Sequence, residues 1–148
     1  MKASTLALAI LLCAAPAAHA EVVEIDNAEL ARLAKTGVPI IDIRTAGEWR
    51  ETGIVPGSQL ITLFDERGRA DANAWLEKVR VVAKPEQPVI VICRSGNRTK
   101  AASELLSKQA GYTRVYNVKQ GIRAWAQEGR AMVPAATAVA ACPAGARC

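Results

Sequence analysis

Two apolar runs constrain the fold of this chain more than any other feature. The runs "VPIIDI" (38–43) and "QPVIVIC" (87–93) are largely continuous rather than alternating with polar residues. Strands buried on both faces have this composition, and they occur mainly in parallel sheets covered by helices. Segments with helical spacing lie between and after the runs. The sequence therefore predicts an α/β fold with a mainly parallel central sheet, flanked by helices on both faces.

Further elements are expected on both sides of these runs. Asp26 or Asn27 can cap a first helix that stops at Gly37, and Gly111 can end a later one. Shorter strands are expected at 22–25, after a turn within 54–61, and at 113–118. Helices are expected at 26–37, 45–53, 71–83, 99–111 and 121–129.

Residues 1–20 have the pattern of a secretory signal peptide. A single lysine precedes an apolar run, and the small-residue end at 18–20 predicts cleavage after Ala20. A buried N-terminal helix is a weaker interpretation. A lipoprotein signal at Cys13 is weaker too, because Leu12 occupies a position that would need a small residue. We expect a periplasmic or secreted protein with no membrane attachment after cleavage.

Charge and histidine content exclude several classes of function. The formal charge of +5 falls to +4 on cleavage, and the basic residues form no block typical of nucleic-acid or membrane binding. His19 is the only histidine and lies in the cleaved segment. A Cys-His or Ser-His base and a histidine-rich metal site are therefore excluded in the mature chain, and neither metal nor cofactor is expected.

Cys93 ends the second apolar run, and the loop after it is suited to anion binding. A thiolate is stabilised by nearby cations, by backbone N–H donors and by a helix N-terminus. Two arginines supply cations, Gly96 lets the backbone curl inward, and Thr99 is expected to open the next helix. Alternatively, Cys93 is only a small buried hydrophobe, but two arginines make a poor core. The pattern favours a nucleophilic thiol in a cradle made by Arg94, Ser95, Gly96, Asn97, Arg98 and Thr99.

Several ordered motifs resemble one known family, the single-domain rhodaneses, of the periplasmic type. The segment "VIVICRSGNRTKAA" looks like the rhodanese active-site loop, and "IIDIRTAGEW" and "GIVPGSQLI" resemble two further family motifs. The segment "VYNVKQGIRAW" resembles the last strand and helix. The predicted domain spans residues 21–130. Ile54 departs from a common histidine and Gln120 from a common glycine, which puts substrate preference in doubt.

The resemblance implies a rhodanese-like fold and a thiosulfate sulfurtransferase activity. Cys93 would accept sulfane sulfur from a small anionic donor such as thiosulfate, and the persulfide would pass it to cyanide or a thiol. Arg94 and Arg98 are candidates to bind the donor, although Arg98 could instead pair with a carboxylate beneath the loop. Two other residues would support the loop: Asp42 through hydrogen bonds to it, and Arg44 by pairing with Glu48. Trp49 and Trp125 are expected in the core.

Two other functions compete with sulfur transfer. The first is a Cys-dependent phosphatase or arsenate reductase. Phosphatases of the tyrosine-phosphatase type need Cys-x5-Arg, whereas Cys93 and Arg98 form Cys-x4-Arg. The shorter loop leaves room for a sulfur atom rather than a phosphoryl group. A persulfide carrier or partner-binding module without rapid turnover is the second alternative.

Residues 131–148 form an alanine-rich extension with little to pack. Its two cysteines, Cys142 and Cys148, enclose five residues and would form a small disulfide loop in an oxidising compartment. A metal site there is disfavoured because no further ligand completes it. A weaker hypothesis is that this tail relays sulfur or resolves oxidised Cys93.

Overall fold

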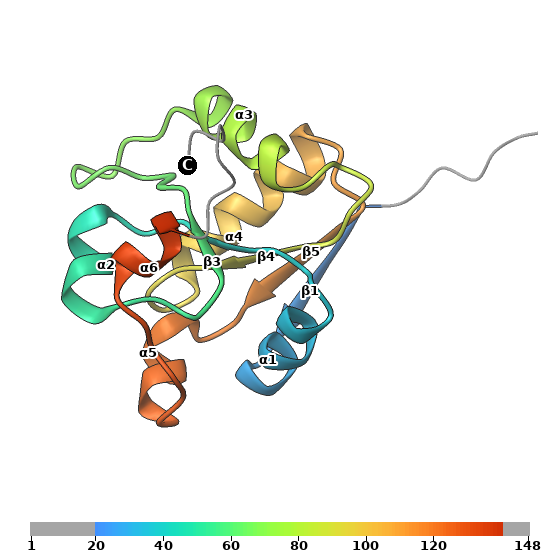
Figure 1. Cartoon of the computed structure of the whole chain (residues 1–148). Coiled ribbons are helices and arrows are strands. Elements are labelled where there is room, and N and C mark those ends of the chain that lie inside the picture. The colour runs from blue at the N-terminus through green and yellow to red at the C-terminus, as the bar shows by residue number, and fades with distance from the viewer. Residues whose placement is uncertain (1–19, 141–148) are drawn as a thin grey trace, which may run out of the picture.

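The computed structural model describes residues 20–140, and the chain alternates strands and helices from residue 21 to residue 127 (Figure 1). The predicted signal peptide and the candidate pair Cys142 and Cys148 lie outside the described residues. The strands are β1 (Glu21–Ile25), β2 (Ile40–Asp42), β3 (Ser58–Leu60), β4 (Val89–Ile92) and β5 (Arg114–Val118). The helices are α1 (Asn27–Lys35), α2 (Ala46–Thr52), α3 (Ala72–Val82), α4 (Asn97–Glu104), the π-helical turn η1 (Leu105–Gln109), α5 (Gly121–Gln127) and α6 (Ala135–Ala140).

All five strands run parallel, in the order β1-β5-β4-β2-β3. The two continuous apolar runs supply β2 and β4, which occupy the interior of the sheet and are buried along their whole length. Because every strand in a parallel sheet points the same way, all carboxyl ends meet at one edge. The predicted α/β architecture is confirmed, and that edge is where Cys93 lies.

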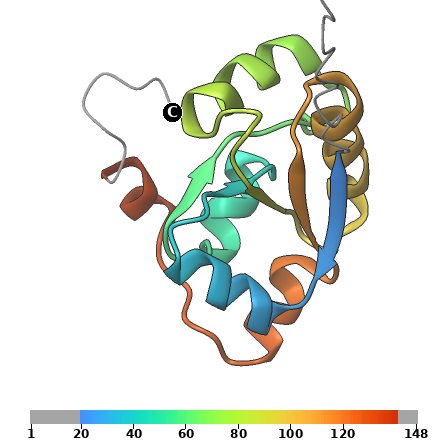
Figure 2. The ribbon, with the colours of Figure 1, turned by 90° about the vertical axis from the view of Figure 1, so that its right-hand side faces the viewer.

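Helices cover both faces of the sheet (Figure 2). Alternate side chains of the strands enter two separate cores, one on each face. One core joins the sheet to α3 and α4 and includes Trp75 and Leu106. The other joins it to α1 and α5 and includes Leu30 and Trp125. Trp125 is therefore a core residue as predicted, whereas Trp49 on α2 is only half-buried. The difference arises because α2 flanks the sheet edge and buries no residue fully.

The helix that follows Cys93 begins two residues earlier than predicted. Gly96 is its N-cap and Asn97 its first residue, so Thr99 lies inside the first turn rather than opening the helix. A glycine in the left-handed region can reverse the chain at once, which shortens the connection between strand and helix. The free loop after Cys93 thus consists of only three residues, 94–96.

Residues 131–133 contact the domain, contrary to the expectation that this stretch has little to pack. The indole Nε1 of Trp125 donates a hydrogen bond to the carbonyl of Ala131, and Val133 pairs with Ile54 in an antiparallel bridge. Helix α6 then lies beside β3 at the sheet edge (Figure 1). The domain boundary at 130 stays a prediction.

The described residues hold neither a membrane-spanning helix nor a cluster of metal ligands. No helix between residues 20 and 140 has the length and apolar character needed to cross a bilayer. Among the same residues, no group of three or more His, Cys, Asp or Glu side chains could hold a metal ion.

Candidate active site

Cys93 follows β4 directly and is buried, with 1% of its surface exposed. Backbone N–H groups in the first turn of α5 bind the carbonyl groups of Cys93 and of the residue after it. The backbone N–H of Ile122 donates to the carbonyl of Cys93 at 2.8 Å, and that of Arg123 donates to the carbonyl of Arg94 at 3.1 Å. The first N–H groups of a helix have no partner within it. Those of α5 fix the position of the cysteine.

The sulfur of Cys93 sits at the base of the three-residue loop. The backbone N–H of Gly96 donates to Sγ with a distance of 3.2 Å, and the Thr99 hydroxyl lies 3.8 Å from Sγ. The same hydroxyl donates to the carbonyl of Gly96 at 2.8 Å. Backbone N–H donors and helix N-termini are groups that bind anions in general. The thiolate cradle stays a prediction, and the structure places two of its six residues, Gly96 and Thr99, next to the sulfur.

Two glycines allow the loop to approach its neighbours closely. Gly96 has φ = +90°, and a Cβ atom there would lie 2.0 Å from the carbonyl oxygen of Lys119. At Gly121, with φ = +62°, a Cβ atom would lie 2.4 Å from the carbonyl oxygen of Cys93. Neither position has room for a side chain. Gly96 was singled out from the sequence, but the contact of Gly121 with the cysteine was missed because it joins segments far apart in the chain.

Arg98 pairs with Glu48, one of the two roles that the sequence left open for it. Its guanidinium makes two hydrogen bonds to the carboxylate, of 2.9 and 2.6 Å, and about a quarter of each side chain is exposed. Burial alone would raise the pKa of Glu48, but hydrogen bonds from Arg98 and from the backbone N–H of Thr45 outweigh it and lower the pKa. The bonds to Glu48 in turn raise the pKa of Arg98.

The predicted pairing of Arg44 with Glu48 is wrong, and so is the predicted bonding of Asp42 to the Cys93 loop. Arg44 instead forms a fork with Asp42, with Nε–Oδ1 and Nη2–Oδ2 distances of 2.9 and 2.7 Å. Both side chains are almost fully buried, and Arg44 also donates to the Thr52 hydroxyl and the carbonyl of Gly53. Two charges only two residues apart neutralise each other where water is excluded. The pair therefore supports α2, which carries Glu48.

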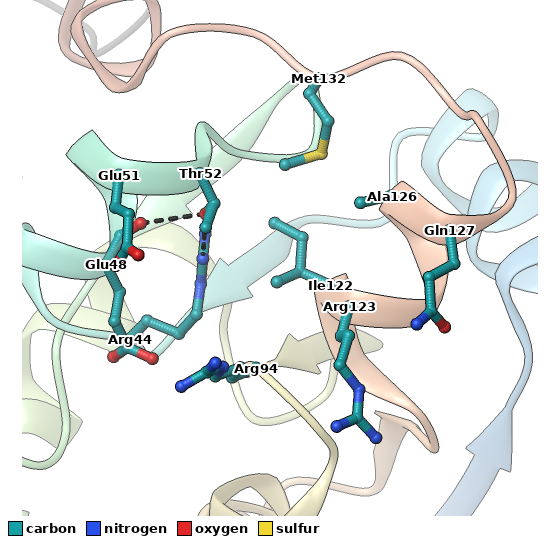
Figure 3. Close-up of a pocket in the computed structure, with 10 residues that line it drawn as sticks. All are labelled: Arg44, Glu48, Glu51, Thr52, Arg94, Ile122, Arg123, Ala126, Gln127 and Met132. Atoms are coloured by element: carbon teal, nitrogen blue, oxygen red, sulfur yellow. Dashed lines mark hydrogen bonds between the residues drawn. The ribbon is translucent and has the colours of Figure 1, made fainter.

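A pocket of about 260 Å³ adjoins the cradle (Figure 3). Arg94, on the loop, and Arg123, on α5, extend their exposed side chains along one side of it. Glu48 belongs to its wall, so the pocket and the cradle share residues. The lining is completed by Arg44, Glu51, Thr52, Ile122, Ala126, Gln127 and Met132. Sequence reasoning missed Arg123 and Met132, because only the fold brings α5 and the chain after it to the cysteine.

The structure gathers the six predicted loop residues around one point but gives them different environments. Gly96 and Thr99 contact the sulfur, and Arg98 is held by a carboxylate. Ser95 and Asn97 make no side-chain hydrogen bond within the part of the chain that the structure describes. Gln120, beside the loop, is exposed and precedes α5 without capping it through its side chain.

Comparisons with known proteins agree with one another. The sequence profile of the Rhodanese-like domain family matches residues 26–128. The chain is 34% identical over 110 residues to "Thiosulfate sulfurtransferase 18" of Arabidopsis thaliana, covering 71% of this chain and 79% of that protein. It is 36% identical over 113 residues to "Sulfurtransferase" of Allochromatium vinosum, covering 74% of this chain and 94% of that one.

Solved structures share the architecture. A rhodanese-related protein from Thermoplasma volcanium superposes with a TM-score of 0.56 at 26% identity, covering 75% of this chain and 97% of that one. The polysulfide-sulfur transferase homodimer from Wolinella succinogenes has a TM-score of 0.60 at 20% identity, covering 76% and 79%. At 20% identity the second likeness shows the fold alone.

Proposed function

Because this chain belongs to the rhodanese-like domain family, we propose that it moves sulfane sulfur through a persulfide on Cys93. The family and the relatives named sulfurtransferases support sulfur transfer in general. The finer proposal is that the donor is thiosulfate or a similar small anion, and that the acceptor is a thiol or cyanide. The observation that carries it is the Cys93 sulfur, which lies at the base of a tight loop and accepts the N–H of Gly96.

In the first step, the Cys93 thiolate attacks the outer sulfur of thiosulfate. A new S–S bond forms at Sγ, the S–S bond of thiosulfate breaks, and sulfite leaves with the electron pair. The enzyme is left with one additional sulfur on Cys93. In the second step, a nucleophilic acceptor attacks that outer sulfur, and the electron pair of the broken bond returns to Sγ.

The cradle stabilises the sulfur in both states. The Gly96 N–H and the N-terminus of α4 are in place before the reaction, so no reorganisation is needed when charge returns to Sγ. Arg94 is the first residue of the loop and is exposed, which suits it to attract an anionic donor. Arg98 acts indirectly, because its hydrogen bonds to Glu48 hold the first turn of α4 against α2.

The engagement of Arg98 disfavours phosphatase chemistry. An arginine that binds a phosphoryl group commonly donates two parallel N–H···O bonds to the oxyanion. In this site the two terminal nitrogens of Arg98 are bonded to Glu48. Together with the short Cys-x4-Arg loop, this favours a sulfur atom as the cargo.

The decisive test compares the wild type with Cys93→Ala and Cys93→Ser in a thiosulfate:cyanide assay. We expect thiocyanate formation to disappear in both variants while the folded state remains. Mass spectrometry after thiosulfate treatment should show one added sulfur on the wild type only. Aryl-phosphatase turnover that exceeds sulfur transfer and is lost in Cys93→Ser would overturn the proposal. Added sulfur without turnover would indicate a carrier.

We also propose that the protein is exported and cleaved after Ala20. Strand β1 begins at Glu21, whose N–H bonds to the carbonyl of Thr113, so cleavage would leave every described element intact. N-terminal sequencing of protein recovered from the periplasm or medium is the test. An intact Met1 on cell-retained protein would contradict export.

A further inference from the structure

The chain that follows α5 is fastened across the pocket as a strap, residues 131–134. The Trp125 indole donates to the carbonyl of Ala131 at 2.9 Å. Val133 and Ile54 exchange two backbone hydrogen bonds of 2.9 and 3.0 Å. Ile54 is fully buried, and it is the residue that departs from the histidine of the family motif. The strap is therefore held on both sides of Met132, outside the region that the family profile matches.

Met132 gives the pocket an apolar wall. It lies across the pocket from Arg94 and Arg123, with Ile122 and Ala126 between the two sides (Figure 3). A thioether side chain is apolar and adaptable, so it suits contact with an aliphatic group. The pocket thus has one apolar side and one cationic side.

On the cationic side of the pocket, carboxylates of the described residues do not neutralise the positive charges of the arginines. Arg44 is neutralised by Asp42, and Glu48 by Arg98. Within residues 20–140, neither Arg94 nor Arg123 forms a salt bridge. Glu51 lies on the α2 wall, beside Thr52 and away from Arg123 (Figure 3). Two unpaired cations on one side of a pocket favour an anionic group there.

We propose that this pocket selects the sulfur acceptor, and that the acceptor is a small aliphatic thiol that carries a carboxylate. The inference rests on the proposed function. The carboxylate binds to Arg94 and Arg123, and the aliphatic stem packs against Met132 and Ile122. A volume of 260 Å³ is slightly below the usual range for drug-sized ligands, which fits a small thiol.

The transfer step is balanced without any other reagent. The thiolate of the acceptor attacks the outer sulfur of the Cys93 persulfide, and a new S–S bond forms on the acceptor. The bond between the outer sulfur and Sγ breaks, and its electron pair stays on Sγ. The products are the Cys93 thiolate and the acceptor persulfide, and the sulfane sulfur has the same oxidation state on both sides.

The test uses three short thiols that differ in charge: 3-mercaptopropionate, 2-mercaptoethanol and cysteamine. Persulfide-loaded full-length protein is mixed with each, and the rate of sulfur loss is expressed per thiolate present. We expect the anionic thiol to react most efficiently and the cationic thiol least. Arg123→Ala should lower kcat/KM for 3-mercaptopropionate by about fivefold, chiefly through KM. The rate with 2-mercaptoethanol should change less than twofold.

Matched variants separate the charge of Arg123 from general effects. Arg80→Ala removes an exposed arginine from α3, on the opposite face of the sheet, and should leave the order of the three thiols unchanged. Glu51→Gln should increase the advantage of the anionic thiol, since it removes a negative charge from the wall. Met132→Ala should raise KM for 3-mercaptopropionate, whereas Met132→Leu should restore it.

The outcomes distinguish this inference from the proposed function. If thiosulfate leaves no sulfur on Cys93, the proposed function fails. If the persulfide forms and cyanide removes it normally, but the three thiols react equally per thiolate, only the acceptor inference is overturned. The same holds if Arg123→Ala and Arg80→Ala have equal effects.

Discussion

The segments at the carboxyl ends of β2 and β4 lie side by side at one edge of the sheet, and each contains an arginine bound to a carboxylate. After β2, Arg44 pairs with Asp42, two residues away, and both are almost completely buried. After β4, Arg98 in the first turn of α4 pairs with Glu48 on α2, fifty residues away, and both remain partly exposed. The first pair joins residues of one segment, whereas the second joins two helices.

This difference separates a structural ion pair from one that belongs to the site. A buried charge that loses its partner has neither a counter-ion nor water to stabilise it. Removal of Arg44 or of Asp42 therefore leaves the other charge uncompensated. A partly exposed pair is screened by water and contributes much less to stability. The Arg98–Glu48 pair contributes more to the geometry of the site than to stability, because it fixes α4, the helix whose N-terminus faces Cys93.

Arg44→Ala should have the largest effect on stability. It leaves the carboxylate of Asp42 buried without its partner, and we expect the free energy of unfolding to fall by about 3–5 kcal/mol. Arg98→Ala should cost about 1 kcal/mol or less. Urea denaturation of both variants measures the contrast. The double variant Asp42→Leu/Arg44→Met should recover much of the loss; equal costs for Arg44→Ala and Arg98→Ala would contradict the comparison.

Gly96→Ala should have the next largest effect, and it should damage the site itself. A Cβ atom would lie 2.0 Å from the Lys119 carbonyl, so the loop must shift away from the cysteine. Gly37 provides the control, because it has a similar φ of +86° with open space around it. Gly37→Ala should cost about 1–2 kcal/mol through backbone strain alone. Gly96→Ala should cost more and should also abolish sulfur transfer, whereas Gly37→Ala should keep it.

The smallest effect concerns the acid sensitivity of the Arg98–Glu48 pair. Because the folded pKa of Glu48 is lowered from its ordinary value of 4.5, the stability that its charge contributes is present above that pH. This contribution disappears as the pH falls through the lower, folded pKa. The unfolding free energies of wild type and Glu48→Gln should differ by at most about 1 kcal/mol at neutral pH and converge as the pH falls through the lowered, folded pKa of Glu48.

Glu77→Gln is the matched control for that experiment. Glu77 pairs with Arg80 on α3, where both side chains are strongly exposed. Its replacement should change stability little at any pH. A gap between wild type and Glu48→Gln that widened on acidification would show that the sign of the effect is wrong.

The sequence was sufficient for the fold and for the location of the thiol. Continuous apolar runs predict buried parallel strands, and a cysteine at the end of such a strand must lie at the carboxyl edge. The start of α4 was misplaced by two residues because Gly96 can cap a helix without a side-chain oxygen. The partner of Arg44 was misassigned because Asp42 and Glu48 both lie within four residues of it, and only the folded geometry decides between them.

The sequence by itself thus determined the α/β class, the position of Cys93, and a loop too short for the Cys-x5-Arg arrangement. These properties depend on local periodicity and on spacing within a few residues. Only the tertiary structure decided that Glu48 holds Arg98, that α5 binds the carbonyl of Cys93, and that Met132 lines the pocket. Those contacts join segments separated by tens of residues, and packing of the whole sheet with its helices brings them together.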